Sequence, residues 1–359
     1  MRSVLPLSVK GLFLMFVEQK AFGVAGSGLP AHLYTVRNRN GMTAVVSDYG
    51  AILTGLLVPS PDGVLRDVVL GYDTLAEYEA GGFFGATVGR HANRISDACF
   101  RLDGAVYRLS DNDNGCNLHS DFTIGFHKQM WDAEPLENGV RFHRISPDGE
   151  AGFPGNLDIC VSYTLDEENG LHILYKGRSD RRTLINLTNH SFFNLSGHDA
   201  GSVLNHIVAL FSDAFLEITP QRLPTGRILS VGGTPFDFRQ PKEIGAEIDA
   251  DRDQLRFARG YDHCFVTGAV PDSLTRIALV ESPVTGCRME VSTNLPGVQF
   301  YTANFLPVQR GKAGVLYTPR CALCLETEYY PDSIHFPSFP QCVFAPDEVY
   351  SAETVYRFL

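Results

Sequence analysis

The chain lacks several features that define whole classes of proteins. It holds only eight cysteines in 359 residues, which are too few and too scattered for a disulfide framework. Cys321 and Cys324 form a C-x-x-C pair, but no second pair stands at zinc-finger spacing. We therefore predict buried core thiols and a reducing compartment. No apolar run is long enough to span a bilayer.

Positive charge is also scarce. The chain has 30 basic against 41 acidic side chains, for a formal net charge of −11. Binding a polyanion requires a basic face, so we predict no nucleic-acid partner. An anionic membrane surface is disfavoured for the same reason, and we predict no membrane partner.

Several familiar catalytic motifs are missing as well. The chain contains no G-x-x-x-x-G-K-[ST], no H-E-x-x-H and no G-x-S-x-G. The glycine-rich stretch 23–28 does not open a helix after a strand, which argues against a dinucleotide site. Phosphate-loop, zinc-protease and serine-hydrolase chemistry are excluded on these patterns.

The N-terminus has a weak leader pattern. Arg2 and Lys10 precede a short apolar run over residues 11–17, at the lower limit for a signal peptide, and Met15 is an alternative start. We treat residues 1–17 as a leader or extension and expect a single domain over residues 18–359. The expected location is the cytoplasm, with the periplasm as the alternative if residues 1–25 act as a signal.

What the chain does have is a repeated pattern of short strands and turns. Asn-Gly and Asp-Gly pairs separate apolar segments, as in β-hairpins. The clearest case is Asn169-Gly170, which lies between alternating apolar residues over 157–165 and 171–175. Helix signals are few, and Thr74 with Glu77 forms a capping box on a short helix. The pattern predicts an all-β fold, one large antiparallel β-sandwich.

One stretch, residues 187–197, carries polar residues where a core strand would carry apolar ones. Asn186, Thr188 and His190 fall on one face, opposite Ile185 and Leu187. Buried polar groups need partners, so this face suits a wet pocket for a ligand rich in hydroxyl groups. A lone histidine at a strand end also suits a purely structural role.

Glu326 is the second unusual residue. It shares a strand face with Ala322, Cys324 and Glu328. On a central apolar strand its carboxylate would be partly desolvated, which raises its pKa and strengthens it as a base. The alternative is an edge strand whose acidic face lies in solvent.

Read together, the polar segments resemble the aldose 1-epimerase, or galactose mutarotase, family. Seven strings carry the resemblance in chain order, and the match runs from about Glu18 to the C-terminus. They lie at 89–95 (GRHANRI), 117–119 (NLH), 146–157 (SPDGEAGFPGNL), 186–195 (NLTNHSFFNL), 260–263 (GYDH), 296–302 (PGVQFYT) and 325–328 (LETE).

The resemblance implies a fold, an activity and a set of roles. The family fold is an antiparallel β-sandwich with an open sugar-binding cleft, and the reaction interconverts the α and β anomers of free hexoses such as galactose and glucose. Glu326 matches the general base and His190 the general acid. Sugar-binding positions are matched by His119, Asp262, Arg94, Asn93 and Gln299. No cofactor and no metal is implied; the partner is a monosaccharide, and we expect a monomer or weak homodimer.

The chemistry explains why these residue types are needed. Opening the hemiacetal removes the proton of the anomeric hydroxyl and delivers one to the ring oxygen. One base and one acid on opposite sides of the sugar can do both. The family's glutamine is replaced here by Glu328, which adds a carboxyl two residues from the base.

Three alternatives stay open on the sequence. A hexose-phosphate 1-epimerase would need an arginine cluster, for which the motifs offer only Arg90 and Arg94. A sugar-binding sandwich without catalysis would share the fold. A metal-dependent sugar enzyme would use His119, His190 and a carboxylate as ligands.

Overall fold

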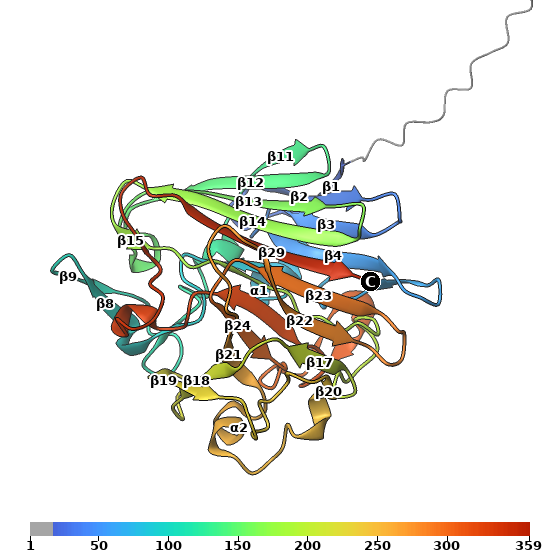
Figure 1. The fold of residues 1–359 in the computed structure, drawn as a ribbon. Helices are drawn as coiled ribbons and strands as arrows, with labels where there is room; N and C mark the ends of the chain where they lie inside the picture. The colour runs from blue at the N-terminus through green and yellow to red at the C-terminus, as the bar shows by residue number, and fades with distance from the viewer. Residues whose placement is uncertain (1–16) are drawn as a thin grey trace, which may run out of the picture.

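The fold is built from three antiparallel sheets, seen in Figure 1. The computed structural model describes residues 17–359. The leader expected over residues 1–17 lies outside the described residues, except for Val17, which begins the first strand. Strands dominate and helices are short, so the predicted all-β antiparallel fold is confirmed.

The largest sheet has nine strands and forms the centre of the molecule. The C-terminal strand β29 lies in its middle, between β14 and β23, so the chain end is part of the core. In sheet order the strands are β11 (Asp132–Leu136), β12 (Gly139–Ser146), β13 (Leu157–Leu165), β14 (Gly170–Ser179), β29 (Tyr350–Phe358), β23 (Arg288–Thr293), β22 (Thr275–Glu281), β17 (Ile207–Leu210) and β20 (Lys242–Glu243).

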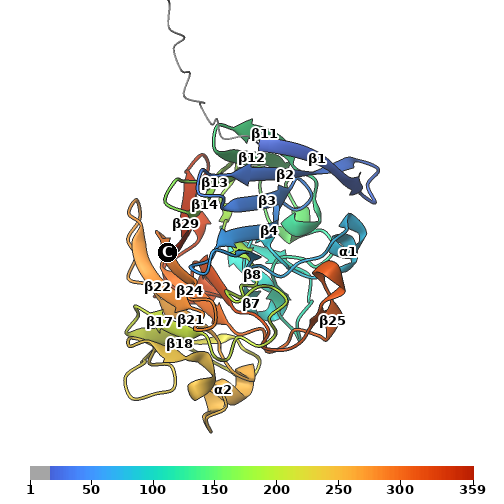
Figure 2. The same ribbon diagram turned by 90° about the vertical axis from the view of Figure 1, so that its right-hand side faces the viewer.

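An N-terminal sheet of five strands packs against part of the nine-stranded sheet (Figure 2). The rings of Tyr34 and Phe142, one from each sheet, meet edge to face at 5.8 Å. This is the buried layer of a β-sandwich. The strands are β1 (Val17–Val24), β2 (Pro30–Arg37), β3 (Thr43–Ser47), β4 (Ile52–Pro59) and β5 (Leu65–Asp67).

The third sheet carries much of the functional site. Its apolar side joins the same core through Phe265, Val298 and Phe300. In order its strands are β19 (Pro224–Ser230), β18 (Ala214–Ile218), β21 (Asp262–Val266), β24 (Gly297–Tyr301) and β27 (Cys324–Glu328).

Two-stranded ladders complete the β structure. They pair β6 (Ala86–Val88) with β16 (Thr188–His190), β7 (Arg94–Ile95) with β10 (Asn117–Leu118), β8 (Cys99–Leu102) with β9 (Ala105–Arg108), β15 (Thr183–Leu184) with β28 (Val343–Phe344), and β25 (Gln309–Arg310) with β26 (Leu316–Tyr317). Single 3-10 turns occur at Ser96–Ala98, Phe126–Lys128, Glu150–Gly152, Ile244–Ala246, Lys312–Gly314 and Ser333–His335.

The hairpin predicted around Asn169-Gly170 is confirmed. β13 and β14 pair in register from Leu157↔Ser179 to Leu165↔Leu171, and the alternating apolar residues are buried. Asn169 has a φ of 60°, the left-handed conformation that asparagine tolerates in tight turns.

Of the two α-helices among the described residues, sequence reasoning found one. α1 (Leu75–Ala80) begins with the predicted capping box, since Thr74 accepts from the Glu77 amide and Glu77 accepts from the Thr74 amide. α2 (Asp253–Ala258) was missed. Its six residues are too few to show a 3.6-residue period.

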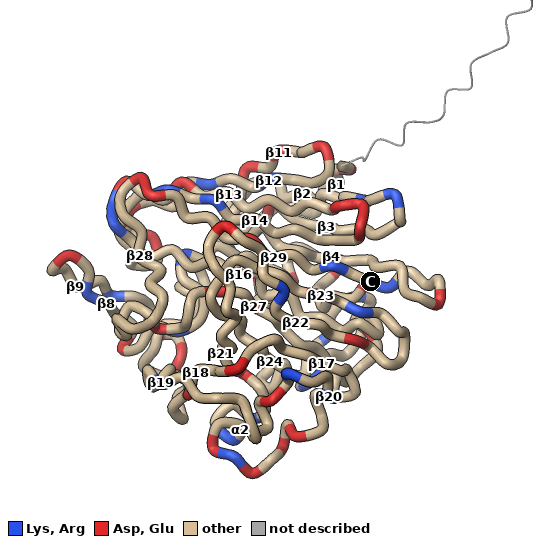
Figure 3. Tube along the Cα trace, in the orientation of Figure 1, with Lys and Arg blue, Asp and Glu red and all other residues tan. Residues whose placement is uncertain are grey.

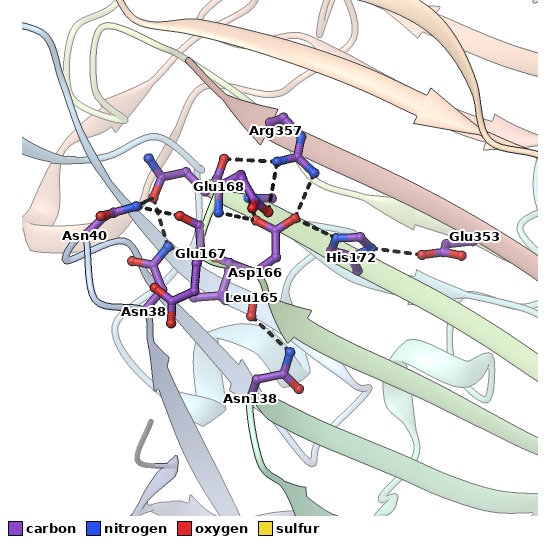
Figure 4. A network of polar contacts seen from close by, with 12 residues as sticks. Asn38, Asn40, Asn138, Leu165, Asp166, Glu167, Glu168, His172, Glu353 and Arg357 are labelled. Carbon is purple, nitrogen blue, oxygen red and sulfur yellow. Dashed lines mark hydrogen bonds and ion pairs between the residues drawn. The ribbon is translucent and has the colours of Figure 1, made fainter. Parts of the chain in front are cut away.

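A polar network ties the turn between β13 and β14 to neighbouring segments of the chain (Figure 4). His172 lies between two carboxylates, with Nδ1 2.9 Å from Glu353 Oε1 and Nε2 3.0 Å from Asp166 Oδ2. Arg357 on β29 donates to the same Asp166 oxygen at 2.8 Å. The side chain of Asn38, beyond the end of β2, donates to the Asp166 carbonyl. The network joins the β13–β14 turn to the first sheet and to the C-terminal strand.

We expect this network to make stability depend on pH. Its bonds to Glu353 and Asp166 raise the pKa of His172. Because the folded pKa is raised, the stabilisation is full below the unfolded value and is lost as pH rises through the folded pKa. His172→Ala should therefore lower the free energy of unfolding by about 1 kcal/mol at pH 6 and by much less at pH 8.5. Urea unfolding at both pH values measures this.

The matched control is His143→Ala. His143 also contacts a carboxylate, Asp158, but His143 is partly exposed and Asp158 largely exposed, so the loss should be small at either pH. An equal loss for His172→Ala at the two pH values would contradict the expected protonation of His172.

Acidic and basic residues are interspersed along loops and strand ends in Figure 3. In residues 17–359, no helix is long and apolar enough to cross a membrane. All eight cysteines are free, and both members of the C-x-x-C pair are buried, as predicted.

Candidate active site

All seven residues expected in the site line one cavity of about 670 Å³. They come from six separated segments of the chain, and the set comprises Asn93, Arg94, His119, His190, Asp262, Gln299 and Glu326. Each is at least nine-tenths buried, which places it in the wall of the hollow and not on the outer surface. The fold thus brings together residues that lie more than 200 positions apart in the sequence, such as Asn93 and Glu326.

Strand register in the third sheet explains how three of these side chains share a face. Gln299 on β24 lies directly opposite Glu326 on β27, and Tyr301 lies opposite Asp262 on β21. Directly opposed residues point to the same face, as do residues two apart on one strand. Asp262, Gln299, Tyr301 and Glu326 therefore face the cavity together.

His190 reaches the same point through a different ladder. β16 pairs with β6, and just beyond β16 the main chain of Phe193 exchanges hydrogen bonds with Leu323, immediately before β27. This contact covers the free edge of β27. Glu326 is consequently only 3% exposed, so its desolvation, predicted from its apolar neighbours, is confirmed although its strand lies at the edge of its sheet.

The imidazole of His190 and the carboxyl of Glu326 are close together. His190 Nε2 lies 3.6 Å from Glu326 Oε2. The imidazole is stacked between Phe192, at 4.8 Å, and Phe83, at 5.7 Å, and its Nδ1 faces Cys324 Sγ at 3.6 Å. Aromatic stacking restricts the ring to one plane. The acid and base expected on opposite sides of a sugar instead lie beside each other on one wall.

Burial changes the pKa values of both groups. It raises the pKa of Glu326 well above its ordinary value, an effect that the carboxyls of Glu328 and Asp262 increase. Burial lowers the pKa of His190 to about 3. Burial therefore favours the neutral form of each group. Hydroxyl donors from a bound sugar would favour the ionised carboxylate.

His119 is held in one tautomer by the main chain. The Asn93 amide donates to His119 Nδ1 at 3.1 Å, and the His119 amide donates to the Asn93 carbonyl at 3.0 Å. Because Nδ1 accepts, the proton of the neutral ring is on Nε2. Burial lowers the pKa of His119 well below its ordinary value, so the ring can act as a neutral hydrogen-bond donor.

Asp262 and Gln299 form a second polar pair in the wall. Gln299 Nε2 donates to Asp262 Oδ1 at 2.6 Å, whereas Gln299 Oε1 has no protein partner among the described residues. A buried amide oxygen without a partner is costly. It therefore offers an acceptor for a ligand hydroxyl.

Sequence reasoning missed Asp113 and Arg222, which also line the cavity. Arg94 Nε donates to Asp113 Oδ2 at 2.8 Å, and Arg222 Nη2 contacts Asp113 Oδ1 at 3.3 Å. Arg222 also lies over the Phe305 ring at 4.4 Å. Neither residue stands in a recognisable string, so no local signal pointed to them.

One sequence interpretation is wrong in detail. Only His190 of the polar face 186–190 lines the cavity. Asn186 instead accepts from the Tyr329 amide at 2.9 Å, and Thr188 is fully buried. Arg90, one of the two arginines open to the disfavoured hexose-phosphate alternative, is 1% exposed and donates to Ser146 Oγ and to four main-chain carbonyls. It braces the loop at 146–155.

The histidines and carboxylate of the metal alternative do converge. His119, His190 and Glu326 each place one ligand-capable atom within 4.8 Å of the other two. Two neutral imidazoles and one carboxylate are a set of ligands that can bind zinc or iron. Any activity test should therefore include a measurement in the presence of a metal chelator.

The chain is similar to known proteins over most of its length. The family model for aldose 1-epimerase matches residues 32–357. Galactose mutarotase from Bos taurus is 41% identical over 315 residues, covering 87% of this chain and 90% of that protein. Aldose 1-epimerase from Escherichia coli (strain K12) is 37% identical, covering 94% of this chain and 97% of that protein.

Solved structures are similar as well. The GalM/aldose epimerase homologue from C. elegans superposes with a TM-score of 0.85 at 30% identity, covering 92% of this chain and 99% of that chain. Galactose 1-epimerase from Lactobacillus acidophilus gives a TM-score of 0.82 at 26% identity, covering 96% and 99%. This chain belongs to the aldose 1-epimerase family. The isomerase class expected from the sequence, with mutarotase activity, is confirmed.

Proposed function

We propose that the protein interconverts the α and β anomers of free hexoses such as galactose and glucose, with Glu326 as general base and His190 as general acid. The observation that carries this assignment is the 3.6 Å approach of His190 Nε2 to Glu326 Oε2 in the cavity wall. Two groups this close can address two atoms that are themselves close neighbours. The anomeric hydroxyl oxygen and the ring oxygen are bonded to the same carbon and meet that condition.

The proton balance of the reaction fits the pair. The base removes the proton of the anomeric hydroxyl, the C1–O5 bond breaks, and the acid delivers a proton to O5. The open aldehyde rotates about its C1–C2 bond, and the same steps in reverse close the ring to the other anomer. The pair carries one proton before and after ring opening, on His190 before the step and on Glu326 after it, and each transfer contributes about 10²–10⁴ in rate.

The remaining residues of the wall would bind hydroxyl groups. His119 Nε2–H donates, Gln299 Oε1 accepts, and the Asp262 carboxylate accepts. Phe83 and Phe192 cover the imidazole with apolar surface, which suits the C–H face of a pyranose. A monosaccharide supplies both kinds of contact.

The cavity is less suited to binding a phosphorylated sugar. The guanidinium of Arg90 already donates its hydrogen bonds to main-chain carbonyls. The two arginines that line the cavity, Arg94 and Arg222, both form ion pairs with the carboxylate of Asp113. Binding a phosphate there would require separating those ion pairs and would bring a second anion beside Asp113.

Polarimetry on freshly dissolved α-galactose and α-glucose tests the proposal. The enzyme should raise the rate of mutarotation above the enzyme-free blank for both sugars, and glucose 6-phosphate should respond far less. Activity unchanged by EDTA would remove the metal alternative. Binding by calorimetry without any acceleration would favour the non-catalytic sugar-binding alternative and overturn the proposal.

We further propose a cytoplasmic location, supported by eight free cysteines, six of them buried. The expectation of a monomer or weak homodimer stays a prediction, which sedimentation would measure.

A further inference from the structure

A second carboxyl lies behind the wall of the active site. Glu328 is on β27, two residues from Glu326 and on the same strand face. Its side chain is completely buried. Oε1 accepts from Asn93 Nδ2 at 2.9 Å, and Oε2 has no hydrogen-bond partner among the described residues. Glu328 does not line the cavity itself.

The surroundings of Glu328 favour a neutral carboxylic acid. No cation pairs with it in the part of the chain that the structure describes; the charged groups that act on its pKa are the carboxylate of Asp262, which raises it, and the guanidinium of Arg94, which lowers it. Burial, together with the Glu328 carboxyl, raises the pKa of the Cys264 and Cys342 thiols. A buried carboxylate with a single donor is far more costly than the protonated form. Burial accordingly raises its pKa well above the ordinary value.

Asn93 connects this carboxyl to the sugar-binding groups. Its Nδ2 donates to Glu328, while its Oδ1 accepts from the Arg94 amide at 2.9 Å. Its own main-chain amide donates to His119 Nδ1. Asn93 has a φ of 61°, in the left-handed region that costs free energy for a residue other than glycine. A bond to a rigid, buried acceptor helps to hold that conformation.

We propose that Glu328 is a positioning residue of the active site, whose neutral carboxyl holds Asn93 and thereby orients His119 and Arg94 toward the sugar. It touches no substrate and transfers no proton in the reaction. This inference rests on the proposed function for its kinetic consequence, whereas its protonation state can be tested without any sugar.

The kinetic test compares Glu328→Gln with Glu328→Leu. Glutamine keeps an oxygen that accepts from Asn93 and is close in shape to the neutral acid, so KM and kcat for galactose should stay within about twofold of wild type. Leucine removes the acceptor and leaves the Asn93 amide unsatisfied, so KM should rise by about fivefold or more. The control is Thr327→Val, on the same buried strand but on its opposite face, where Thr327 bonds to Thr354; its KM should not change.

The protonation test follows the Tm of Glu328→Gln against wild type between pH 4.5 and pH 8. A folded pKa above the unfolded one means that wild type loses stability as pH rises, and the variant has no such titration. The Tm difference should therefore grow in favour of Glu328→Gln by about 4 °C over this range. This Tm measurement does not depend on whether the Glu328→Leu variant folds.

Several results would overturn the proposed role of Glu328. A Tm difference that is constant with pH, or that favours wild type at pH 8, means that Glu328 is ionised and overturns the inference. So does a KM for Glu328→Leu equal to that of wild type, or a Glu328→Gln variant as impaired as the leucine one. Absence of mutarotation in wild type would defeat the proposed function but leave the Tm result to be read on its own.

Discussion

Replacing Glu326 with glutamine is expected to lower kcat for mutarotation by at least about 10³-fold, because glutamine cannot accept the proton of the anomeric hydroxyl. The fold should persist. Glutamine has nearly the same shape, and the change removes a buried carboxyl whose Oε2 has no hydrogen-bond partner among the described residues. Polarimetry on α-galactose, corrected for the spontaneous reaction, measures the rate, and thermal unfolding checks the fold.

Glu134→Gln is the control for this variant. Glu134 lies on β11 with an exposed side chain that contacts Arg141 at 3.4 Å, and it is not part of the cavity. Its rate should equal that of wild type. A near-normal rate for Glu326→Gln in a folded protein would reject Glu326 as the base and redirect attention to the Asp262 carboxylate.

The environment of Glu326 also predicts the pH profile of the wild-type enzyme. Burial, with the carboxyls of Glu328 and Asp262, raises its pKa. The base is lost when the carboxylate is protonated, so kcat/KM should fall as pH decreases through that raised pKa. The acidic limb should thus lie above the value of about 4.3 that an ordinary glutamate shows.

Replacing His190 with asparagine is the second large effect. We expect kcat to fall by about 10² or more, while KM changes by no more than about threefold, because an amide can still form hydrogen bonds to the sugar but cannot transfer a proton at this step. Initial rates over a range of galactose concentrations separate the two constants. A rise in KM with kcat unchanged would make His190 a binding residue only.

The control here is His143→Asn. His143 is a partly exposed histidine on β12 that contacts Asp158, away from the cavity. Its kinetic constants should match those of wild type, which would show that the loss in His190→Asn comes from the site and not from removing a histidine from the sandwich.

Some parts of the fold could be predicted because their signals are local. The hairpin of β13 and β14 was predicted from alternating residues and an Asn-Gly turn, and α1 from its capping box. α2 was missed because six residues barely exceed one helical turn. The position of β29 in the middle of the nine-stranded sheet has no local signal at all, since it depends on pairing with strands more than 50 residues away.

The site shows the same division. The resemblance pointed to seven residues, and all seven line the cavity. Asp113 and Arg222 were missed because ion pairing between segments more than 100 residues apart leaves no pattern in the sequence. Asn186 was misplaced because alternation gives the side of a strand but not what packs against that side.

The sequence by itself determined which faces are apolar, where the chain turns and which proton-transfer groups are present, because these depend on residue type and short-range spacing. Only the tertiary structure decided that His190 and Glu326 lie 3.6 Å apart on one wall, that Arg90 is occupied by main-chain carbonyls, and that Glu328 is buried behind Asn93. Register between distant strands and exclusion of water are properties of packing, and no short segment of the chain carries them.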